Sequence, residues 1–317
     1  WLCTQPSQPV ESSLSKPKMD TTIVLPANYS FPSGQTFKVL SWNVEHFVDP
    51  YDNPYIDNDR EDNPPSNMET RRHLLLSAIR KADADIVLLQ EFESARYLAQ
   101  LAEDSLSGMG YRFFADAPSP DWYMNVVMMS RFPIGVVRGY GTVTTPVLGY
   151  LNEEGKKETQ NHINTRMWTA DVYPSEAYSF AITGVHLKAG RGPRNIGMRK
   201  GQIHFLISQL EEIQEASSKA NFMIAGDFNA LIGSEEMSLL LKDSLLSDAF
   251  IDPIDTAIKS HPADDPRRRL DYMLINPNMN KELVENGMEI CYFFSKDSMR
   301  IISDHLPVVG TFYRADK

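Results

Sequence analysis

The sequence has few cysteines, no long hydrophobic run and no excess of positive charge. Cys3 and Cys291 are its only cysteines, so it offers neither a disulfide framework nor a thiolate metal site. No apolar run is long enough to cross a membrane. Lys and Arg number 31 against 42 Asp and Glu, a net charge of −11. We therefore expect no broad, nonspecific binding to duplex nucleic acid, because that affinity needs many cations that displace counterions from phosphates.

The negative charge does not exclude a phosphate substrate, since carboxylates that hold a metal ion make a site acidic and the bound cation reverses the local charge. With 42% hydrophobic and 23% charged residues, the composition is typical of a globular protein with a sizeable core. The length suits one large α/β domain with a tail. We expect residues 1–35, rich in Ser, Pro, Gln and Lys, to be a flexible tail or tether, and residues 36–317 to be the folded domain of a monomer.

The first residues favour export. The chain opens at Trp1 rather than at a methionine, which suggests that a leader has been removed. Cys3 could then be a lipidated residue with a polar tether behind it, and the protein would be periplasmic, extracellular or lipid-anchored. A cysteine in an ordinary tail, and a cytoplasmic protein, are the alternatives.

Short apolar runs alternate with helical patterns beyond residue 36. The clearest helices are predicted at Thr70–Lys81 and at about Asn195–Ala216, where apolar residues recur on one face. Two polar stretches, Asp49–Asn67 and about Val147–Asn164, are predicted as a surface loop and a hairpin-like loop. Buried strands are predicted at Phe37–Trp42, Asp85–Gln90, Val126–Met129, Trp168–Val172, Phe180–Val185, Phe222–Ala225, Tyr272–Ile275 and Leu306–Phe312.

Polar residues cluster at the ends of these strands. Each has a structural alternative when taken alone: a turn for Asn43, a helix-start acid for Glu91, a buried hydrogen-bonded imidazole for His186. Together they supply hard oxygen donors and two histidines. Mg²⁺ or Mn²⁺ prefers such oxygen ligands, and Ca²⁺ also accepts them. The set comprises Asn43, Glu45, Glu91, His186, Asp227, Asn229, Asp271, Asp304 and His305.

These segments, in this order, resemble the signature of the endonuclease/exonuclease/phosphatase superfamily. The resemblance runs from about Phe37 to Tyr313. Its most specific parts are Ser-Trp-Asn-Val-Glu ending at Glu45, Gln-Glu ending at Glu91, Gly-Asp-Phe-Asn ending at Asn229, Arg-Leu-Asp-Tyr ending at Tyr272, and Ser-Asp-His ending at His305. The resemblance implies a metal-dependent phosphoesterase with a four-layer α/β sandwich: two packed mixed β-sheets flanked by helices.

The resemblance also implies roles for single residues. Asn43, Glu45, Glu91 and Asp304 would form the metal site, with Glu91 as its principal carboxylate. Asp227 would position or deprotonate the attacking water, and Asn229 would donate to the phosphate. His305 would contact the phosphate with Asp271 as its partner, and His186 would be a second phosphate-facing histidine. Tyr123 and Asn125 match positions where several members place phosphate-contacting groups.

A local basic cluster follows His186. Lys188, Arg191 and Arg194 could hold phosphates beyond the scissile one; the alternative is a solvated loop. A nuclease or phosphodiesterase acting on nucleic acid is the favoured interpretation. The alternatives are a phosphatase or phospholipase C-like hydrolase of an inositol or sphingolipid headgroup and, third, a catalytically inactive binding protein with the same fold.

Overall fold

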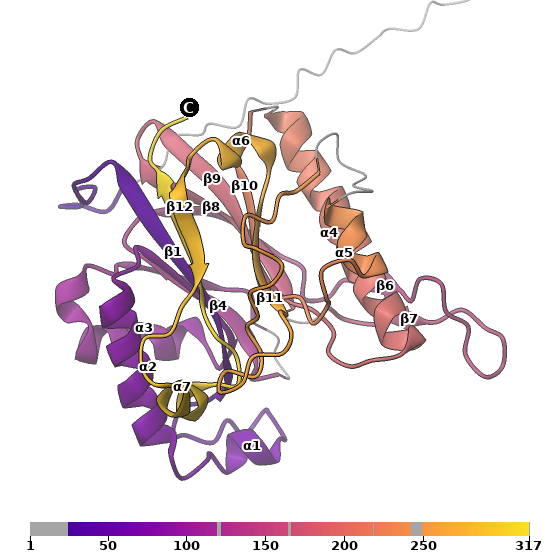
Figure 1. Cartoon of the computed structure of the whole chain (residues 1–317). Helices are drawn as coiled ribbons and strands as arrows, with labels where there is room; N and C mark the ends of the chain where they lie inside the picture. The colour runs from indigo at the N-terminus through magenta and orange to yellow at the C-terminus, as the bar shows by residue number, and fades with distance from the viewer. Residues whose placement is uncertain (1–24, 119–121, 164–165, 218, 242–248, 317) are drawn as a thin grey trace, which may run out of the picture.

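The computed structural model describes residues 25–118, 122–163, 166–217, 219–241 and 249–316 (Figure 1). Cys3 and most of the predicted tail lie outside these residues, so the tail and its lipidation remain predictions. Residues 25–35 form neither helix nor strand. None of the helices in these ranges combines the length and the apolar character needed to cross a membrane.

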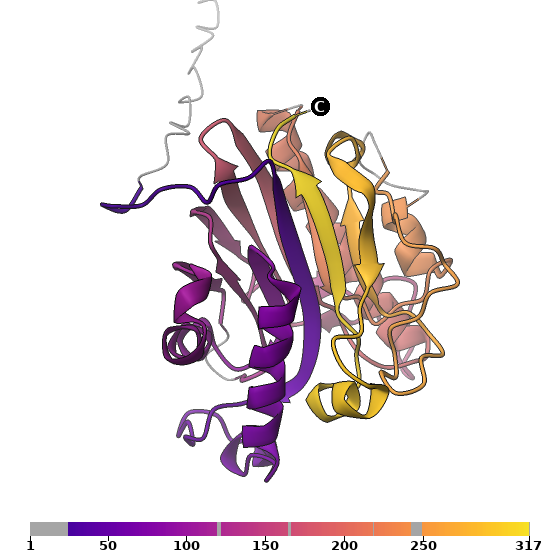
Figure 2. The same ribbon diagram turned by 60° about the vertical axis from the view of Figure 1, so that its left-hand side comes forward.

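Two mixed β-sheets form the centre of the molecule (Figures 1 and 2). The first has the order β12-β13-β1-β2-β4-β3 and the second the order β11-β10-β9-β8-β5. The first sheet comprises β1 (Thr36–Phe47), β2 (Ile86–Phe92), β3 (Phe113–Asp116), β4 (Asn125–Ser130), β12 (Leu283–Ile290) and β13 (Val308–Tyr313). The second comprises β5 (Ile134–Gly139), β8 (Met167–Ser175), β9 (Tyr178–His186), β10 (Phe222–Asp227) and β11 (Asp271–Ile275).

Helices cover the outer face of each sheet. Helices α2 (Met68–Ala82), α3 (Ala95–Ser105) and α7 (Lys296–Ile302) pack on the first sheet, and α4 (Pro193–Ala216) and α5 (Glu235–Leu241) on the second. The alternation along β1 shows why the layers form: Val39 points into the core between the sheets, whereas Leu40 points toward the helices. The predicted four-layer sandwich is confirmed.

The two strongest helix predictions are also confirmed. Thr70–Lys81 lies within α2, which ends at Asp83 in the left-handed conformation. Asn195–Ala216 lies within α4, which has a proline in its first turn. A short helix, α6 (Pro277–Asn280), and a 3₁₀ turn, η1 (Ser107–Met109), complete the connections.

The two polar stretches are more ordered than simple loops. The insertion at residues 49–67 contains a one-turn helix, α1 (Asp59–Asp62), capped by Asn58. Its Glu61 is buried and accepts a hydrogen bond from the Asn53 amide at 2.8 Å. The surface-loop prediction missed this turn because four residues show no periodicity. The second stretch forms the predicted hairpin, in which β6 (Thr145–Pro146) pairs with β7 (Thr159–Gln160).

The sheet topology brings the strand ends together. β1 runs parallel to β2, and β9 runs parallel to β10, so the carboxyl ends within each pair meet at one edge. β10 also contacts β1 and β2 across the core. Residues that follow these four strands therefore converge, although they come from distant parts of the sequence.

Candidate active site

The predicted polar residues end neighbouring strands. Asn43 lies near the end of β1 and Glu91 near the end of β2. In the second sheet Asp227 pairs laterally with His186 on one side and with Asp271 on the other. This register places three ionisable side chains in one row.

The backbone at these strand ends is unusual. Glu45, His46, Glu91 and Asn229 all have φ between 48° and 58°, a region that residues other than glycine seldom adopt. The pairing of β1 with β2 also shifts in register between Asn43 and Phe47. Such local strain is typical of sites that aim side chains at a shared centre.

Asn43 joins the two sheets at this edge. It is fully buried, and its Nδ2 donates to Oε1 of Glu91 and to Oδ2 of Asp227, both at 3.1 Å. Its Oδ1 accepts from the backbone amide of Glu45 at 3.0 Å. The amide group thus fixes two carboxylates that the sequence separates by more than a hundred residues.

Asp227 is buried and held from several directions. The backbone amide of Asn229 donates to its Oδ1 at 2.8 Å, and Nδ2 of Asn229 donates to its Oδ2 at 3.1 Å. Burial raises the pKa of Asp227 to about 7, against the opposing charge of His305. A carboxylate with a pKa near neutrality suits a general base at neutral pH. Nδ2 of Asn229 also donates to the Leu187 carbonyl at 3.1 Å, so it orients Asp227 in this arrangement.

His186 and His305 lie on either side of Asp227. Nε2 of His186 is 3.9 Å from Oδ2 of Asp227 and 3.5 Å from Oε1 of Glu91, and Nε2 of His305 is 3.9 Å from the same Asp227 oxygen. Burial lowers the pKa of His186 to about 4. Burial alone would also lower that of His305, but Asp271, Asp227 and Asp304 raise it to about 10.

Asp271 orients His305, as the resemblance implied. Its Oδ2 lies 2.8 Å from Nδ1 of His305. Ser260, which is fully buried, donates its hydroxyl to the same carboxylate at 2.6 Å and accepts from the Leu270 amide. Ser260 is a site residue that the sequence did not reveal, because no motif surrounds it.

Asp304 is held by a second histidine. Nε2 of His261 lies 3.2 Å from Oδ2 of Asp304, while Nδ1 of His261 accepts from Nε of Arg268 at 3.1 Å. This pairing requires the proton on Nε2, so His261 donates to Asp304. Burial would raise the pKa of Asp304, but the hydrogen bond from His261 and the charge of His305 lower it to about 2.

The structure divides the predicted metal residues into two pairs. Asn43 lies with Glu91, whereas Glu45 binds Arg300 at 2.7 Å and the Asp304 backbone amide at 3.0 Å. Within the described ranges, two groups of donors at this edge have ligand atoms within 4.8 Å of one another: Asp227, Asp271 and His305; and His261, Asp304 and His305.

The donor set fits a hard divalent cation. Oε1 of Glu91 accepts from Asn43 and Oε2 accepts from the His46 amide at 3.0 Å. A carboxylate offers about four lone-pair positions, so each oxygen keeps capacity for a metal. Carboxylate and carboxamide oxygens are the ligands that Mg²⁺ and Mn²⁺ prefer.

Tyr123 and Asn125 reach the site through other groups. Both are buried, with 2% and 3% of their surface exposed. The Tyr123 hydroxyl lies 2.7 Å from Nδ1 of His46, whose Nε2 is 3.6 Å from Glu91. Nδ2 of Asn125 donates to the Glu93 carbonyl. The sequence prediction missed His46, although it directly follows Glu45.

The basic cluster after His186 is only partly available. Arg194 pairs with Glu158 at 2.6 Å, whereas Lys188 and Arg191 have no acidic side-chain partner among the described residues. Arg166 adds a cation that the sequence prediction missed. Its backbone carbonyl accepts from the His186 amide, and its buried Nε has no hydrogen-bond partner within the described chain.

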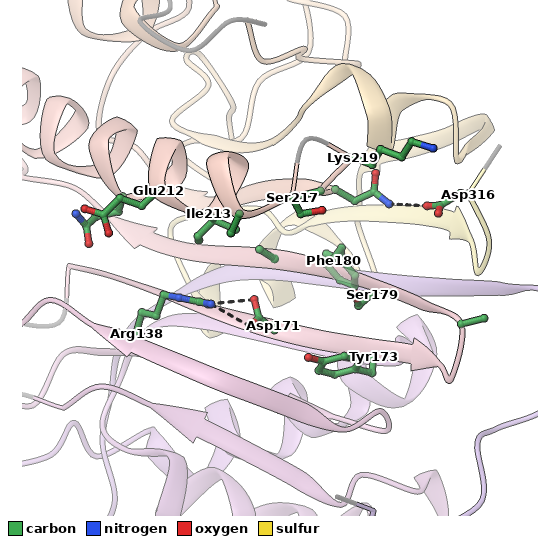
Figure 3. Close-up of a pocket in the computed structure, with 16 residues that line it drawn as sticks. Arg138, Asp171, Tyr173, Ser179, Phe180, Glu212, Ile213, Ser217, Lys219 and Asp316 are labelled. Carbon is green, nitrogen blue, oxygen red and sulfur yellow. Dashed lines mark hydrogen bonds and ion pairs between the residues drawn. The ribbon is translucent and has the colours of Figure 1, made fainter. Parts of the chain in front are cut away.

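A separate cavity of about 820 Å³ lies between α4 and the second sheet (Figure 3). At its edge Arg138 and Asp171 form a bidentate ion pair at 3.0 and 3.1 Å. Ala181 and Asn221 line it near the start of β9 and β10, at the opposite end from the cluster around Asp227. None of the clustered residues lines this cavity, so the candidate active site is the strand-end cluster.

The model of the Endonuclease/Exonuclease/phosphatase family matches residues 40–305, which include every strand-end residue described above. The chain belongs to the endonuclease/exonuclease/phosphatase family. It is therefore a phosphoric ester hydrolase of a kind that depends on a divalent metal. A comparison with curated proteins gives no match.

Solved structures show the same fold at low sequence identity. The human Nocturnin catalytic domain with bound sulfate anion is 19% identical, with a TM-score of 0.56 over 89% of this chain and 96% of that one. TDP2 from D. rerio, complexed with a single-strand DNA product, is 17% identical, with a TM-score of 0.58 over 87% and 98%. SmcL is 16% identical, with a TM-score of 0.56 over 87% and 99%.

Proposed function

We propose that this family member is a phosphodiesterase that acts on nucleic acid and uses Mg²⁺ or Mn²⁺, with Ca²⁺ as a further candidate. The observation that carries the proposal is the arrangement around Asp227. This buried carboxylate is fixed by Asn43 and Asn229 and lies between a neutral His186 and a charged His305.

Each group has a chemical task in this proposal. Glu91 and Asn43 would hold the metal ion, with Asp304 as the further carboxylate that the family resemblance implies, and the metal would supply Lewis acidity to a phosphoryl oxygen. Asp227 accepts a proton from the attacking water. His305, kept charged by Asp271, donates from Nε2 to a phosphoryl oxygen and stabilises the negative charge that develops there. His186, uncharged, orients the bound phosphate beside Glu91.

Two features favour a diester in nucleic acid. Lys188 and Arg191 supply cations after β9 that a single phosphate at Asp227 would not need. A structural relative, TDP2, was solved with a single-strand DNA product, so this fold accommodates a nucleic acid strand. Export of the protein, with or without a lipid on Cys3, is proposed on the sequence alone.

The test is hydrolysis of bis(p-nitrophenyl) phosphate with EDTA, Mg²⁺, Mn²⁺ or Ca²⁺, followed by plasmid DNA, single-stranded RNA, sphingomyelin and inositol phosphates. We expect metal-dependent cleavage of the aryl diester and of nucleic acid. Asp227→Asn should lower kcat by about 10²–10⁴-fold. Asp265→Asn, an exposed carboxylate paired with Arg267, is the matched control. Wild-type activity in Asp227→Asn would exclude this residue from the mechanism.

A further inference from the structure

A cavity of about 590 Å³ lies beside the candidate active site and is lined by residues of the α1 insertion and of α7. Figure 1 shows these two segments near each other at one end of the molecule. Its walls include residues of the insertion at 49–67 and the C-terminal half of α7. The lining is mostly polar and charged, and its members include Glu45, His46, Asp59, Arg60, Asn63 and Arg300.

The cavity shares a wall with the metal end of the site. The backbone amide of Glu45 donates to Oδ1 of Asn43, and that of His46 donates to Oε2 of Glu91. A group bound in the cavity would therefore contact residues whose backbone amides hydrogen-bond the proposed metal ligands Asn43 and Glu91.

The carboxylates of this cavity already have partners. Glu45 binds Arg300 at 2.7 Å, and Asp59 accepts a hydrogen bond from Asn63 at 3.2 Å. The guanidinium of Arg60 makes no hydrogen bond or ion pair with any described residue. Burial lowers the pKa of His46, the charge of Glu91 raises it, and the charge of Arg60 lowers it. The Arg60 guanidinium is therefore close enough to His46 to interact with it electrostatically.

The same insertion presents aromatic rings to solvent. Tyr51 is 70% exposed and Tyr55 is 84% exposed, whereas large apolar side chains normally bury most of their surface. Exposed rings on the same insertion as an unpaired arginine suit a single-stranded nucleic acid, which stacks its bases on aromatic rings while cations neutralise its phosphates. A lipid would instead need an apolar docking surface.

We propose that the cavity is a subsite for a phosphate adjacent to the scissile one in a single-stranded polynucleotide, with Arg60 as its main cation. This proposal rests on the proposed function and specifies its substrate. Arg60 follows β1 of the first sheet, whereas Lys188 and Arg191 follow β9 of the second. Cations therefore follow site-bearing strands of both sheets, an arrangement that suits a nucleic acid strand extending past the scissile position.

The test measures binding and turnover separately. Binding of a fluorescein-labelled deoxythymidine decamer is followed by anisotropy in EDTA, as a function of salt. Turnover is measured with the same decamer and with bis(p-nitrophenyl) phosphate, which has no second phosphate. The variants are Arg60→Ala, Arg60→Lys and Tyr55→Ala. Arg96→Ala is the matched control, because Arg96 is an exposed arginine on α3 that lines none of the cavities described above.

We expect Arg60→Ala to weaken decamer binding about tenfold and to reduce the slope of log K against log salt by about 0.7, the loss of one single-strand phosphate contact. Arg60→Lys should restore the slope. Tyr55→Ala should weaken binding with an unchanged slope, because stacking releases no counterion. Hydrolysis of the aryl diester should stay normal in all these variants.

Three results would overturn the subsite: Arg60→Ala behaving like Arg96→Ala, equal losses on the decamer and the aryl diester, or Arg60-dependent binding of inositol hexakisphosphate without binding of the decamer. Absence of hydrolysis of every substrate with every metal would instead refute the proposed function. Anisotropy would still decide whether Arg60 binds a strand.

Discussion

At the scale of single residues, two histidines 119 residues apart in the chain have opposite charge states at neutral pH. His186 is buried with Arg166 nearby, and burial lowers its pKa to about 4. His305 is equally buried but faces three carboxylates, which raise its pKa to about 10. The positive charge available to a phosphate therefore comes from His305, and its retention depends on Asp271.

The first prediction concerns this pairing. Asp271→Asn keeps the size of the side chain but removes the anion that faces Nδ1 of His305 at 2.8 Å. The pKa of His305 should fall, and kcat should drop by about 10²–10⁴-fold, on the scale seen when a charged partner of a histidine is neutralised. The measurement combines kcat with the ¹⁵N chemical shifts of the His305 ring.

Ser260→Ala is a milder change at the same contact. It removes one hydrogen bond to Asp271, at 2.6 Å, and leaves the anion in place. We expect a loss in kcat of about tenfold. A shifted His305 titration together with wild-type kcat would show that the charge of this ring does not matter for catalysis.

The second prediction concerns His261 as a positioning residue. Its Nε2 donates to Asp304, and its ring lies edge-on to that of His305 with centroids 4.7 Å apart. His261→Phe keeps the ring contact and removes the hydrogen bond, so the Asp304 carboxylate should lose its orientation. We expect metal affinity, measured by calorimetry without substrate, to fall about 10–100-fold, as for other groups that orient ligands.

His261→Gln provides the contrast, since a carboxamide can donate to Asp304 again and should recover much of the affinity. His73→Phe, at an exposed helix position outside the site, is the control for loss of a histidine. Equal metal affinity in the Phe and Gln variants would assign His261 a packing role only.

The residues of the site that could be predicted from the sequence are those that stand in short motifs after strands, such as Asn43, Glu91 and Asp227. Ser260 and His261 could not be predicted, because each depends on a contact with a residue distant in the chain. The basic cluster shows the same limit: Arg194 belongs to it by sequence, but its guanidinium pairs with Glu158, 36 residues earlier.

At the scale of elements, β10 approaches β9 through a glycine. Gly226 has φ of 141°, and a Cβ atom added there would lie 2.0 Å from the Val185 carbonyl oxygen. The close approach aligns Asp227 with His186. A side chain at Gly226 would force the strands apart at the point where the site is assembled.

The third prediction follows from that contact. Gly226→Ala should destabilise the protein by roughly 2–4 kcal/mol, since steric overlap adds to backbone strain, and should lower activity in the folded fraction. Gly233→Ala is the matched control: φ is 85°, but an added Cβ meets nothing within 4 Å. Denaturant unfolding measures both variants. Similar losses of stability in the two variants would mean that backbone strain, rather than the approach of β10 to β9, explains the need for glycine at position 226.

The elements that could be predicted are those with strong periodicity or a continuous apolar run. Strands β1, β2, β4, β8, β9, β10, β11 and β13 fall in this class, because burial makes most of their residues apolar. Strands β5 and β12 lie at sheet edges and are half-exposed, so their sequences carry no comparable run. Helix α7 has only seven residues, too few to show a helical repeat.

At the scale of the whole molecule, the two sheets are joined by polar groups at the end opposite the site. The Tyr178 hydroxyl at the start of β9 donates to Glu282, which directly precedes β12 of the other sheet. Nδ2 of Asn221 donates to Glu282 at 3.0 Å and to Asp316 at 3.0 Å. Substitutions at this end should therefore change the stability of the protein without altering the candidate active site.

The fourth prediction concerns the pH dependence of stability. Burial, with the nearby charge of Asp316, raises the pKa of Glu282 from 4.5 to about 7 in the folded protein. A raised pKa means that the unfolded chain releases this proton more readily. The contribution to folding is therefore complete below pH 4.5, declines as the pH rises, and is lost above about 7. The full loss is on the order of 3 kcal/mol.

Glu282→Gln mimics the protonated carboxyl group and cannot ionise. Its free energy of unfolding should match that of the wild type near pH 4.5 and exceed it at pH 8. Glu285→Gln, an exposed change on β12, should follow the wild type at both values. Parallel pH profiles for the wild type and Glu282→Gln would show that folding does not raise the pKa of Glu282, so that the carboxylate is ionised in the folded protein at neutral pH. The polar junction would then hold the sheets through a charged carboxylate, with Tyr178 and Asn221 as its donors.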